Sequence, residues 1–149
     1  MEVSVQTEDF DPQAVVDALC KGRKDIGALV TFVGLVRDSA QSPSLTAMEL
    51  EHYPGMTEKA LEEIANEAHQ RWSLQGASII HRVGKLLPAE RIVMVAVASM
   101  HRSEAFQACE FIMDFLKTRA PFWKKEHTAG EAHWVDARER DVDAQARWQ

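Results

Sequence analysis

Residues 92–121 read IVMVAVASMHRSEAFQACEFIMDFLKTRAP, and this stretch decides what kind of fold the chain can adopt. Its first part, Ile92 to Ala98, is an apolar run rich in β-branched residues, which predicts a buried strand. From about Ser103 apolar residues recur every three or four positions and stop ahead of Pro121, which predicts an amphipathic helix. The apolar stripe of this helix is expected to contain Ala105, Phe106, Cys109, Ile112, Met113 and Leu116.

The same two patterns recur on both sides of this stretch. Residues 28–36 are nearly all apolar and β-branched, which predicts a strand covered on both faces. Residues 45–52 alternate as in a half-buried strand, with Glu49 and Glu51 pointing outward. Further predictions are a helix over about 12–20, a helix from Pro54-Gly55 to Trp72, a strand at about 77–83, and two short strands within 122–137. Strands and helices are interspersed without strict alternation, so the expected class is α+β with a mixed, mostly antiparallel sheet.

Composition limits the possible functions. A chain of 149 residues with 46% hydrophobic content can bury one core, so we expect a single domain over residues 1–149. The net charge of −6 argues against general nucleic-acid binding and against an anionic membrane surface. The N-terminus lacks the basic start and apolar run of a signal peptide, and no apolar stretch reaches the roughly 20 residues of a membrane span. We therefore expect a cytoplasmic protein.

Several common chemistries have no support in the sequence. Cys20 and Cys109 lie far apart within helix-like patterns, which favours buried thiols over a disulfide or a redox pair. The six histidines and two cysteines show no zinc-ligand spacing, so no metal site is expected. There is no P-loop, no GxGxxG and no GxSxG motif.

One segment, residues 117–126, gathers four cations and two aromatic residues around Pro121 in an otherwise acidic chain. Lysine and arginine can bind phosphate or carboxylate, and aromatic rings can support a heterocycle. The segment thus predicts a site for an anionic, aromatic ligand. The alternative is structural, since cations at a helix C-terminus also complement the helix dipole and the aromatic residues could be core.

Two further candidates lie where a strand ends. His101 and Arg102 stand between the strand at 92–98 and the following helix, where free backbone amides attract anions. The alternative is that Ser103 is an ordinary helix cap beside two solvated side chains. Arg37 ends the strand at 28–36, a frequent place for functional residues, although a lone arginine there is more often solvated.

Taken together, the motifs resemble the molybdopterin synthase large-subunit family. The resemblance covers roughly residues 28–138 and depends on five segments in the family's order. These are Thr31 to Arg37, Leu50 to Met56, Ile80 to Gly84, His101-Arg102 with Ala105-Phe106, and Phe111 to Glu126. One departure is Ala89-Glu90, where the family typically has glycine before an acidic residue.

The resemblance implies an α/β hammerhead-like fold and a sulfurtransferase that needs no metal and no other cofactor. The enzyme would take sulfur from the C-terminal Gly-Gly thiocarboxylate of a small ubiquitin-like carrier protein. It would pass this sulfur to cyclic pyranopterin monophosphate and form the dithiolene of molybdopterin. The implied assembly is a homodimer with a carrier at each end, which makes a heterotetramer.

The resemblance also implies roles for single residues. Lys117 and Lys124 would be catalytic, because a lysine there can neutralise the incoming carboxylate and a developing oxyanion. The residues implied to bind the phosphate and pterin are Arg37, His101, Arg102, Lys125 and Glu126, with Phe32 and Met113 as apolar walls and Arg138 as a further ligand.

Helix geometry adds one constraint to these roles. Arg102 and Lys117 bracket the same predicted helix, so their backbones should lie about 22 Å apart at 1.5 Å per residue. That is too far for one small ligand. Either the substrate touches only one set of residues, or His101 and Arg102 reach it from a neighbouring subunit; we favour the second hypothesis.

Two other functions remain open at this stage. His101 and the cationic segment could hydrolyse a phosphoester, with histidine as general acid or base. Alternatively, the cationic segment could belong to a protein-binding module that captures an acidic peptide terminus.

Overall fold

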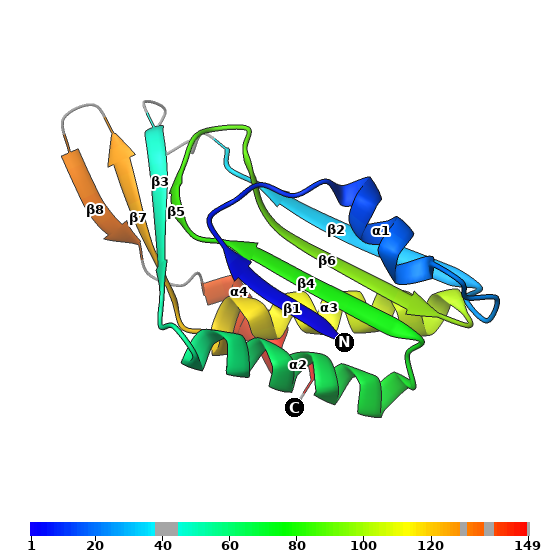
Figure 1. Cartoon of the computed structure of the whole chain (residues 1–149). Coiled ribbons are helices and arrows are strands. Elements are labelled where there is room, and N and C mark those ends of the chain that lie inside the picture. The colour runs from blue at the N-terminus through cyan, green and yellow to red at the C-terminus, as the bar shows by residue number, and fades with distance from the viewer. Residues whose placement is uncertain (38–44, 129–130, 136–138, 149) are drawn as a thin grey trace.

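The computed structural model describes residues 1–37, 45–128, 131–135 and 139–148 (Figure 1). The expected loop at 38–44 and the candidate ligand Arg138 therefore lie outside the described residues. In chain order the elements are β1 (Glu2–Gln6), α1 (Pro12–Cys20), β2 (Ala28–Leu35), β3 (Leu45–His52), α2 (Met56–Trp72), β4 (Gly76–Arg82), β5 (Gly84–Leu86), β6 (Arg91–Ser99), α3 (Arg102–Arg119), β7 (Phe122–Thr128), β8 (Glu131–Val135) and α4 (Glu139–Ala146).

The first sheet has the strand order β1-β4-β6-β2. β1 runs parallel to β4, and the other two pairings are antiparallel. Helices α2 and α3 cover one face of this sheet, and α1 lies on the other (Figure 1). Strand β6 is central, and its residues from Val93 to Ser99 are all buried, as the apolar run predicted.

The second sheet has the order β5-β3-β7-β8 and is antiparallel throughout. A small core joins it to the end of the first sheet; this core contains Val36, Met48, Leu50, Val83 and Leu86. The α+β class with mixed, mostly antiparallel pairing is confirmed. The strands divide into two sheets, which the sequence analysis did not anticipate.

The predicted helices over 12–20 and from Pro54-Gly55 to Trp72 are confirmed. Asp11 caps α1 by accepting a hydrogen bond from the Gln13 amide at 3.0 Å, and Pro12 stands in the first turn. Helix α2 starts after Gly55, whose φ of 85° is favourable for glycine, and it buries Leu61, Ile64, Ala65 and Ala68. The apolar stripe of α2 therefore packs where its 3.6-residue period predicted.

Strand β2 corrects one expectation, because it is not covered on both faces in this chain. It stands at the edge of the first sheet, and Leu29, Phe32 and Leu35 are 36%, 40% and 54% exposed. Helix α1 packs over the inner strands β4 and β6, so the outer strand is left partly open. An apolar run in the sequence indicates a strand buried on both faces only when that strand is central in its sheet.

Helix α3 corrects a second expectation. Phe106 was placed on the apolar stripe, yet it is 61% exposed. The buried residues are Ala105, Ala108, Cys109, Phe111, Ile112, Phe115 and Leu116. Phe111 and Phe115 thus provide the large core side chains, because the buried stripe passes beside Phe106 and not through it. Burial also raises the pKa of the Cys109 thiol to about 11, as suits a buried structural cysteine.

Three elements had no sequence prediction. Strand β1 pairs in parallel with β4 at the edge of the first sheet, strand β5 spans only three residues, and helix α4 lies in the polar C-terminal segment. The end of this segment is fixed by Trp148, whose ring makes edge contacts with Trp72 and Phe111 and whose Nε1 donates to Asp114 at 2.6 Å. The chain past the second sheet therefore returns to pack against α2 and α3.

Candidate active site

The C-terminal end of α3 and the start of β7 bring two candidate catalytic residues to one junction. Lys117 lies in the last turn of α3, and Lys124 is the third residue of β7. Pro121 separates the two elements because it cannot continue the helix. The buried Thr57 hydroxyl donates to the Pro121 carbonyl at 3.0 Å and accepts from the Tyr53 amide at 2.9 Å. These bonds fix the junction to the start of α2.

A buried histidine lies beneath this junction. The His81 ring stacks on Phe122, with ring centroids 3.8 Å apart and planes 18° from parallel. Its Nδ1 lies 2.8 Å from the Arg82 carbonyl oxygen, so Nδ1 carries the proton that is donated. The pKa of His81 is lowered to about 4, chiefly by burial, with smaller contributions from the charges of Lys117 and His52 and an opposing one from the Arg82 hydrogen bond. His81 is therefore a neutral ring close to Lys117.

Strand β7 separates the two lysines that are adjacent in sequence. Lys124 pairs with Leu50, on the same face as Phe122, whereas Lys125 pairs with Glu49 on the opposite face. His127, also on the second face, lies 3.3 Å from the Glu49 carboxylate. A single pocket on one face can thus contact only one of Lys124 and Lys125. The side chain of Glu126 is outside the described residues, so its role stays a prediction.

Phe32 lies within β2, and Arg37 lies just past the end of this strand. Arg37 is exposed and directly follows Val36, which is buried in the small core with Leu50. A Cβ placed on Gly34 would lie 2.8 Å from Val93 Cγ1 and 3.4 Å from Phe32 Cε1. The Phe32 ring therefore extends over Gly34 along β2, towards the end that carries Arg37. Met113 is half-buried on α3 and packs at the edge of the main core.

The opposite end of α3 carries the remaining candidates. His101 is the N-cap residue in place of Ser103, and neither His101 nor Arg102 is buried. Helix α3 runs without interruption from Arg102 to Lys117, so the predicted separation of about 22 Å holds within one chain. A phosphoesterase site that combines His101 with the cationic segment of the same chain is not compatible with this geometry.

The buried support of the site has no counterpart in the sequence analysis. The stacking of His81 on Phe122 joins residues 41 positions apart. Thr57 received no prediction at all. The available signal was the histidine within the apolar β4 pattern, since a buried titratable side chain in a strand requires a specific partner.

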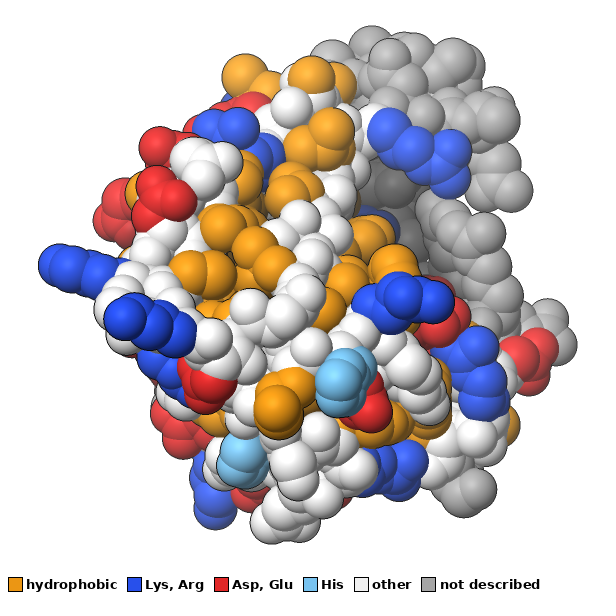
Figure 2. Space-filling model, turned by 90° about the vertical axis from the view of Figure 1, so that its right-hand side faces the viewer, with side chains coloured by type: hydrophobic (Ala, Val, Ile, Leu, Met, Phe, Trp, Pro, Cys, Tyr) orange, Lys and Arg blue, Asp and Glu red, His pale blue; other side chains and the backbone are white. Residues whose placement is uncertain are grey.

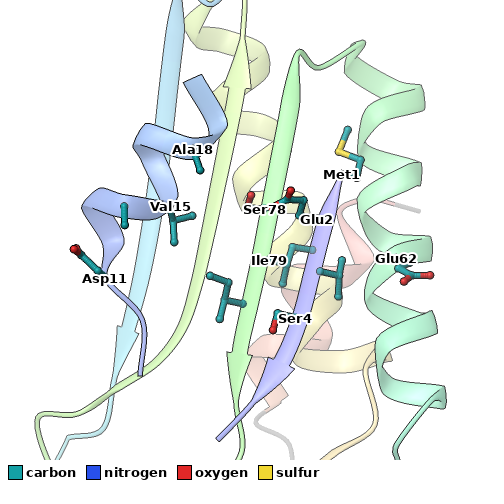
Figure 3. A pocket seen from close by; sticks show the side chains of 12 residues that line it. Met1, Glu2, Ser4, Asp11, Val15, Ala18, Glu62, Ser78 and Ile79 are labelled. Carbon is teal, nitrogen blue, oxygen red and sulfur yellow. The ribbon is translucent and has the colours of Figure 1, made fainter. Parts of the chain in front are cut away.

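A separate hollow of about 640 Å³ lies between α1 and the strands β1 and β4 (Figure 3). Three carboxylates, those of Glu2, Asp11 and Glu62, lie around it, and it contains none of the candidate site residues. Its acidic border does not suit an anionic substrate.

The described ranges contain neither a metal-binding cluster nor a helix that could span a membrane. Among these residues no group of three or more histidine, cysteine, aspartate or glutamate side chains could hold a metal ion. Within the same ranges no helix is long and apolar enough to cross a membrane.

Comparisons with known proteins give these residues a family context. A model of the MoaE protein family matches residues 5–119. The chain is 60% identical over 146 residues to the molybdopterin synthase catalytic subunit of Ralstonia nicotianae, covering 98% of this chain and 83% of that protein.

Two solved structures are similar over nearly the whole chain. The molybdopterin biosynthesis MoaE protein from Burkholderia ambifaria is 56% identical with a TM-score of 0.83, covering 99% of this chain and 97% of that one. Molybdopterin synthase from Staphylococcus aureus is 30% identical with a TM-score of 0.82, covering 89% and 95%. The ordered motifs, the two-sheet fold and these matches agree, and the chain belongs to the MoaE protein family, whose relative in Ralstonia nicotianae is a molybdopterin synthase catalytic subunit.

Proposed function

We propose that this protein is the catalytic subunit of a molybdopterin synthase. It transfers sulfur from the thiocarboxylate terminus of a small carrier protein to cyclic pyranopterin monophosphate, forming the dithiolene of molybdopterin. The observation that supports this most strongly is the junction of α3 and β7, which presents Lys117 and Lys124 beside the neutral, buried His81 and its partner Phe122.

Lys117 and Lys124 act on the carbonyl carbon of the carrier terminus. Once the thiocarboxylate sulfur has bonded to the pterin precursor, water adds to the resulting thioester carbonyl and negative charge develops on its oxygen. Cleavage of the C–S bond then leaves the sulfur on the pterin and a carboxylate on the carrier. An ammonium group beside that oxygen stabilises the charge most effectively where neighbouring groups are apolar or neutral. His81 and Phe122 provide such neighbours, since the buried imidazole carries no charge at neutral pH.

The pterin phosphate occupies the space near the end of β2. Arg37 is suited to hold the phosphate through paired hydrogen bonds. Phe32, which extends over Gly34, and the half-buried Met113 supply apolar surface for the ring system. Lys125, Glu126 and Arg138 stay proposed ligands, and Lys125 would have to approach from the face opposite to Lys124.

A second copy of this chain completes the site. His101 and Arg102 cannot reach Lys117 along one α3 helix, so the partner in a homodimer supplies them. The exposed apolar side chains of β2 and of the start of α3 support such an association; these are Leu29, Phe32, Leu35, Met100 and Phe106. On the face shown in Figure 2, hydrophobic side chains gather in a band through the middle of the view.

The remaining partner is the small ubiquitin-like carrier with a C-terminal Gly-Gly thiocarboxylate. The name catalytic subunit, which the relatives carry, implies that another subunit completes the enzyme. With one carrier on each catalytic subunit the assembly is a heterotetramer. The proposed location is the cytoplasm, and the proposed reaction uses no metal ion and no other cofactor.

Reconstitution tests this function. The purified chain is mixed with thiocarboxylated carrier and cyclic pyranopterin monophosphate, and dithiolene product is measured. We expect product only when the carrier bears sulfur. Failure under conditions in which the Staphylococcus aureus synthase works would contradict the proposal. Phosphate release from simple esters without a carrier would support a hydrolase instead, and tight carrier binding without turnover would support a binding module.

A further inference from the structure

Arg82 is a buried cation for which the proposed reaction has no role. It ends β4, is only 7% exposed, and belongs to the motif Ile80 to Gly84. Its Nε and Nη2 donate to the Thr7 carbonyl at 3.2 and 3.1 Å, and its Nη1 donates to the Arg91 carbonyl at 3.0 Å. A guanidinium buried so completely requires acceptors on several sides, and here it joins three segments of the chain.

The charge of Arg82 faces two carboxylates. Its Nη1 lies 3.6 Å from Glu90 Oε1 and 4.0 Å from Asp9 Oδ1. Asp9 is already held by Arg91, which donates two hydrogen bonds of 3.0 Å to its carboxylate. For Glu90, Arg82 is the cation within ion-pair distance among the described residues, so Arg82 holds its carboxylate in place.

Glu90 in turn fixes the turn that connects β5 to β6. Its Oε2 accepts a hydrogen bond from the Leu87 amide at 2.5 Å, and its own amide donates to the Leu87 carbonyl at 3.1 Å. The turn includes Ala89 with a φ of 75°, a conformation that costs an alanine energy. Leu87 is 50% exposed, so the polar contacts, and not apolar packing, determine the shape of this turn.

The same turn forms hydrogen bonds with both the amide and the carbonyl group of Val36. The Ala89 amide donates to the Val36 carbonyl at 2.7 Å, and the Val36 amide donates to the Glu90 carbonyl at 2.9 Å. Val36 is the residue directly before Arg37, whose side chain is exposed. A continuous set of contacts therefore runs from Arg82 through Glu90 and Val36 to the backbone of Arg37.

We propose that Arg82 and Glu90 are positioning residues for the substrate: through the turn at 87–90 they hold Arg37 where it binds the substrate phosphate. Neither residue touches the substrate in this account. The inference rests on the proposed function, because Arg37 is a phosphate ligand only if the pterin monophosphate is the substrate. It predicts a defect in substrate affinity that depends on the presence of Arg37.

A double-mutant cycle tests this inference in the reconstituted synthase. Glu90→Ala removes both the contact to Arg82 and the acceptor for the Leu87 amide. We expect it to raise KM for cyclic pyranopterin monophosphate by about threefold to tenfold while kcat stays within about twofold. Glu90→Gln keeps an oxygen that can accept from Leu87, so it should recover part of the loss. In an Arg37→Ala background, Glu90→Ala should raise KM no further.

Glu110→Gln is the matched control. Like Glu90, Glu110 pairs with an arginine that contacts a second carboxylate as well. Arg147 lies 2.7 Å from Glu110 and 3.0 Å from Asp114. It lies on α3 away from the turn, and its substitution should leave KM unchanged. If Glu90→Ala melts below the assay temperature, Glu90→Gln takes its place in the same cycle.

Two results would overturn the inference. If the Glu90 substitution raises KM by the same factor with and without Arg37, the turn does not act through Arg37. If Arg37→Ala alone leaves KM unchanged, both the role of Arg37 and the inference are wrong. Continued dithiolene formation by the wild-type protein would still support the proposed synthase in either case, so the two failures are distinguishable.

Discussion

The two ends of helix α3 both present exposed cations, but different groups lie beneath those cations. At the C-terminal end, Lys117 follows the buried Phe115 and Leu116 and lies close to the neutral ring of His81. At the N-terminal end, His101, Arg102 and Phe106 are all exposed. Both ends carry cations suited to an anionic substrate. Lys117 is exposed, like His101 and Arg102, so the two ends differ in the buried groups that lie beneath the cation and not in its access to water.

This difference indicates how the site is divided. Lys117 beside a neutral ring can stabilise developing charge once the carrier terminus and the substrate displace water, so the C-terminal end is suited to the chemical step. The N-terminal end contributes to the same site only if another copy of the chain brings it there. Phe106 beside Arg102 gives that end an apolar contact for a second copy of the chain. The account therefore assigns chemistry to one end and substrate binding in trans to the other.

The largest effect is expected at the C-terminal end. Lys117→Ala should reduce the rate of dithiolene formation about a hundredfold or more, because removing one charge-stabilising group commonly has that effect. The rate is measured with saturating carrier and pterin. Lys59→Ala, which removes an exposed lysine from α2, is the control. Near-normal turnover by Lys117→Ala would remove the basis for treating this end as the chemical one.

A smaller effect is expected at the N-terminal end. Phe106→Glu places a charge in the proposed contact between copies and should weaken the dimer about tenfold or more, because buried aromatic residues contribute strongly to interfaces. Sedimentation measures the association. Val142→Glu on α4, where the side chain is 53% exposed, serves as the control. Unchanged association of Phe106→Glu would show that this end is not covered by a second copy.

The third prediction concerns the neutral ring beneath Lys117. The pKa of His81 is lowered to about 4 in the folded chain, chiefly by burial, from an ordinary value of 6.5. Between these values the unfolded chain binds a proton that the folded chain does not, so stability is full above pH 6.5. It falls as the pH drops towards 4, by about 1.4 kcal/mol per pH unit.

His81→Gln tests this dependence through the free energy of unfolding measured between pH 4 and 7. The variant should lose the part of the pH dependence that His81 contributes, whereas the exposed His69→Gln should retain it. A slope unchanged in His81→Gln would mean that the ring is not held neutral by its surroundings. The contrast between the two ends of α3 would then lose its electrostatic basis.

The smallest effect is expected away from both ends. Ala89 has a φ of 75°, which an L-residue adopts at a cost that glycine avoids. Ala89→Gly should therefore raise the free energy of unfolding by about 1 kcal/mol in thermal or urea unfolding. Turnover should not change, because the backbone contacts of the turn remain. A loss of stability would contradict the left-handed geometry at this position.

Local periodicity predicted much of the fold. The strand and helix within 92–121 were predicted because a continuous apolar, β-branched run and a period-3.6 pattern are properties of neighbouring residues. The exposure of Leu29 and Leu35 on β2 was not predictable in the same way, because it depends on which strand occupies the sheet edge. Periodicity identifies an apolar strand but carries no information on strand order.

The site was predictable in part for a similar reason. The distance between Arg102 and Lys117 was predicted from the helical rise. The separation of Lys124 from Lys125 could also have been predicted, from strand alternation. The stacking of His81 on Phe122 is a contact between distant segments, so no local pattern encodes it. The resemblance to known synthases supplied the reaction, which residue patterns alone did not specify.

Mixing two inactive variants tests the divided site most directly. Lys117→Ala and Arg102→Ala chains are purified separately and allowed to exchange subunits, and dithiolene formation is measured with exchange confirmed by differential tags. A heterodimer has one site with both defects and one with neither. The account predicts that activity returns upon mixing, up to about a quarter of the wild-type rate at equal exchange, since half of the dimers carry one intact site of two. No recovery despite confirmed exchange would contradict it.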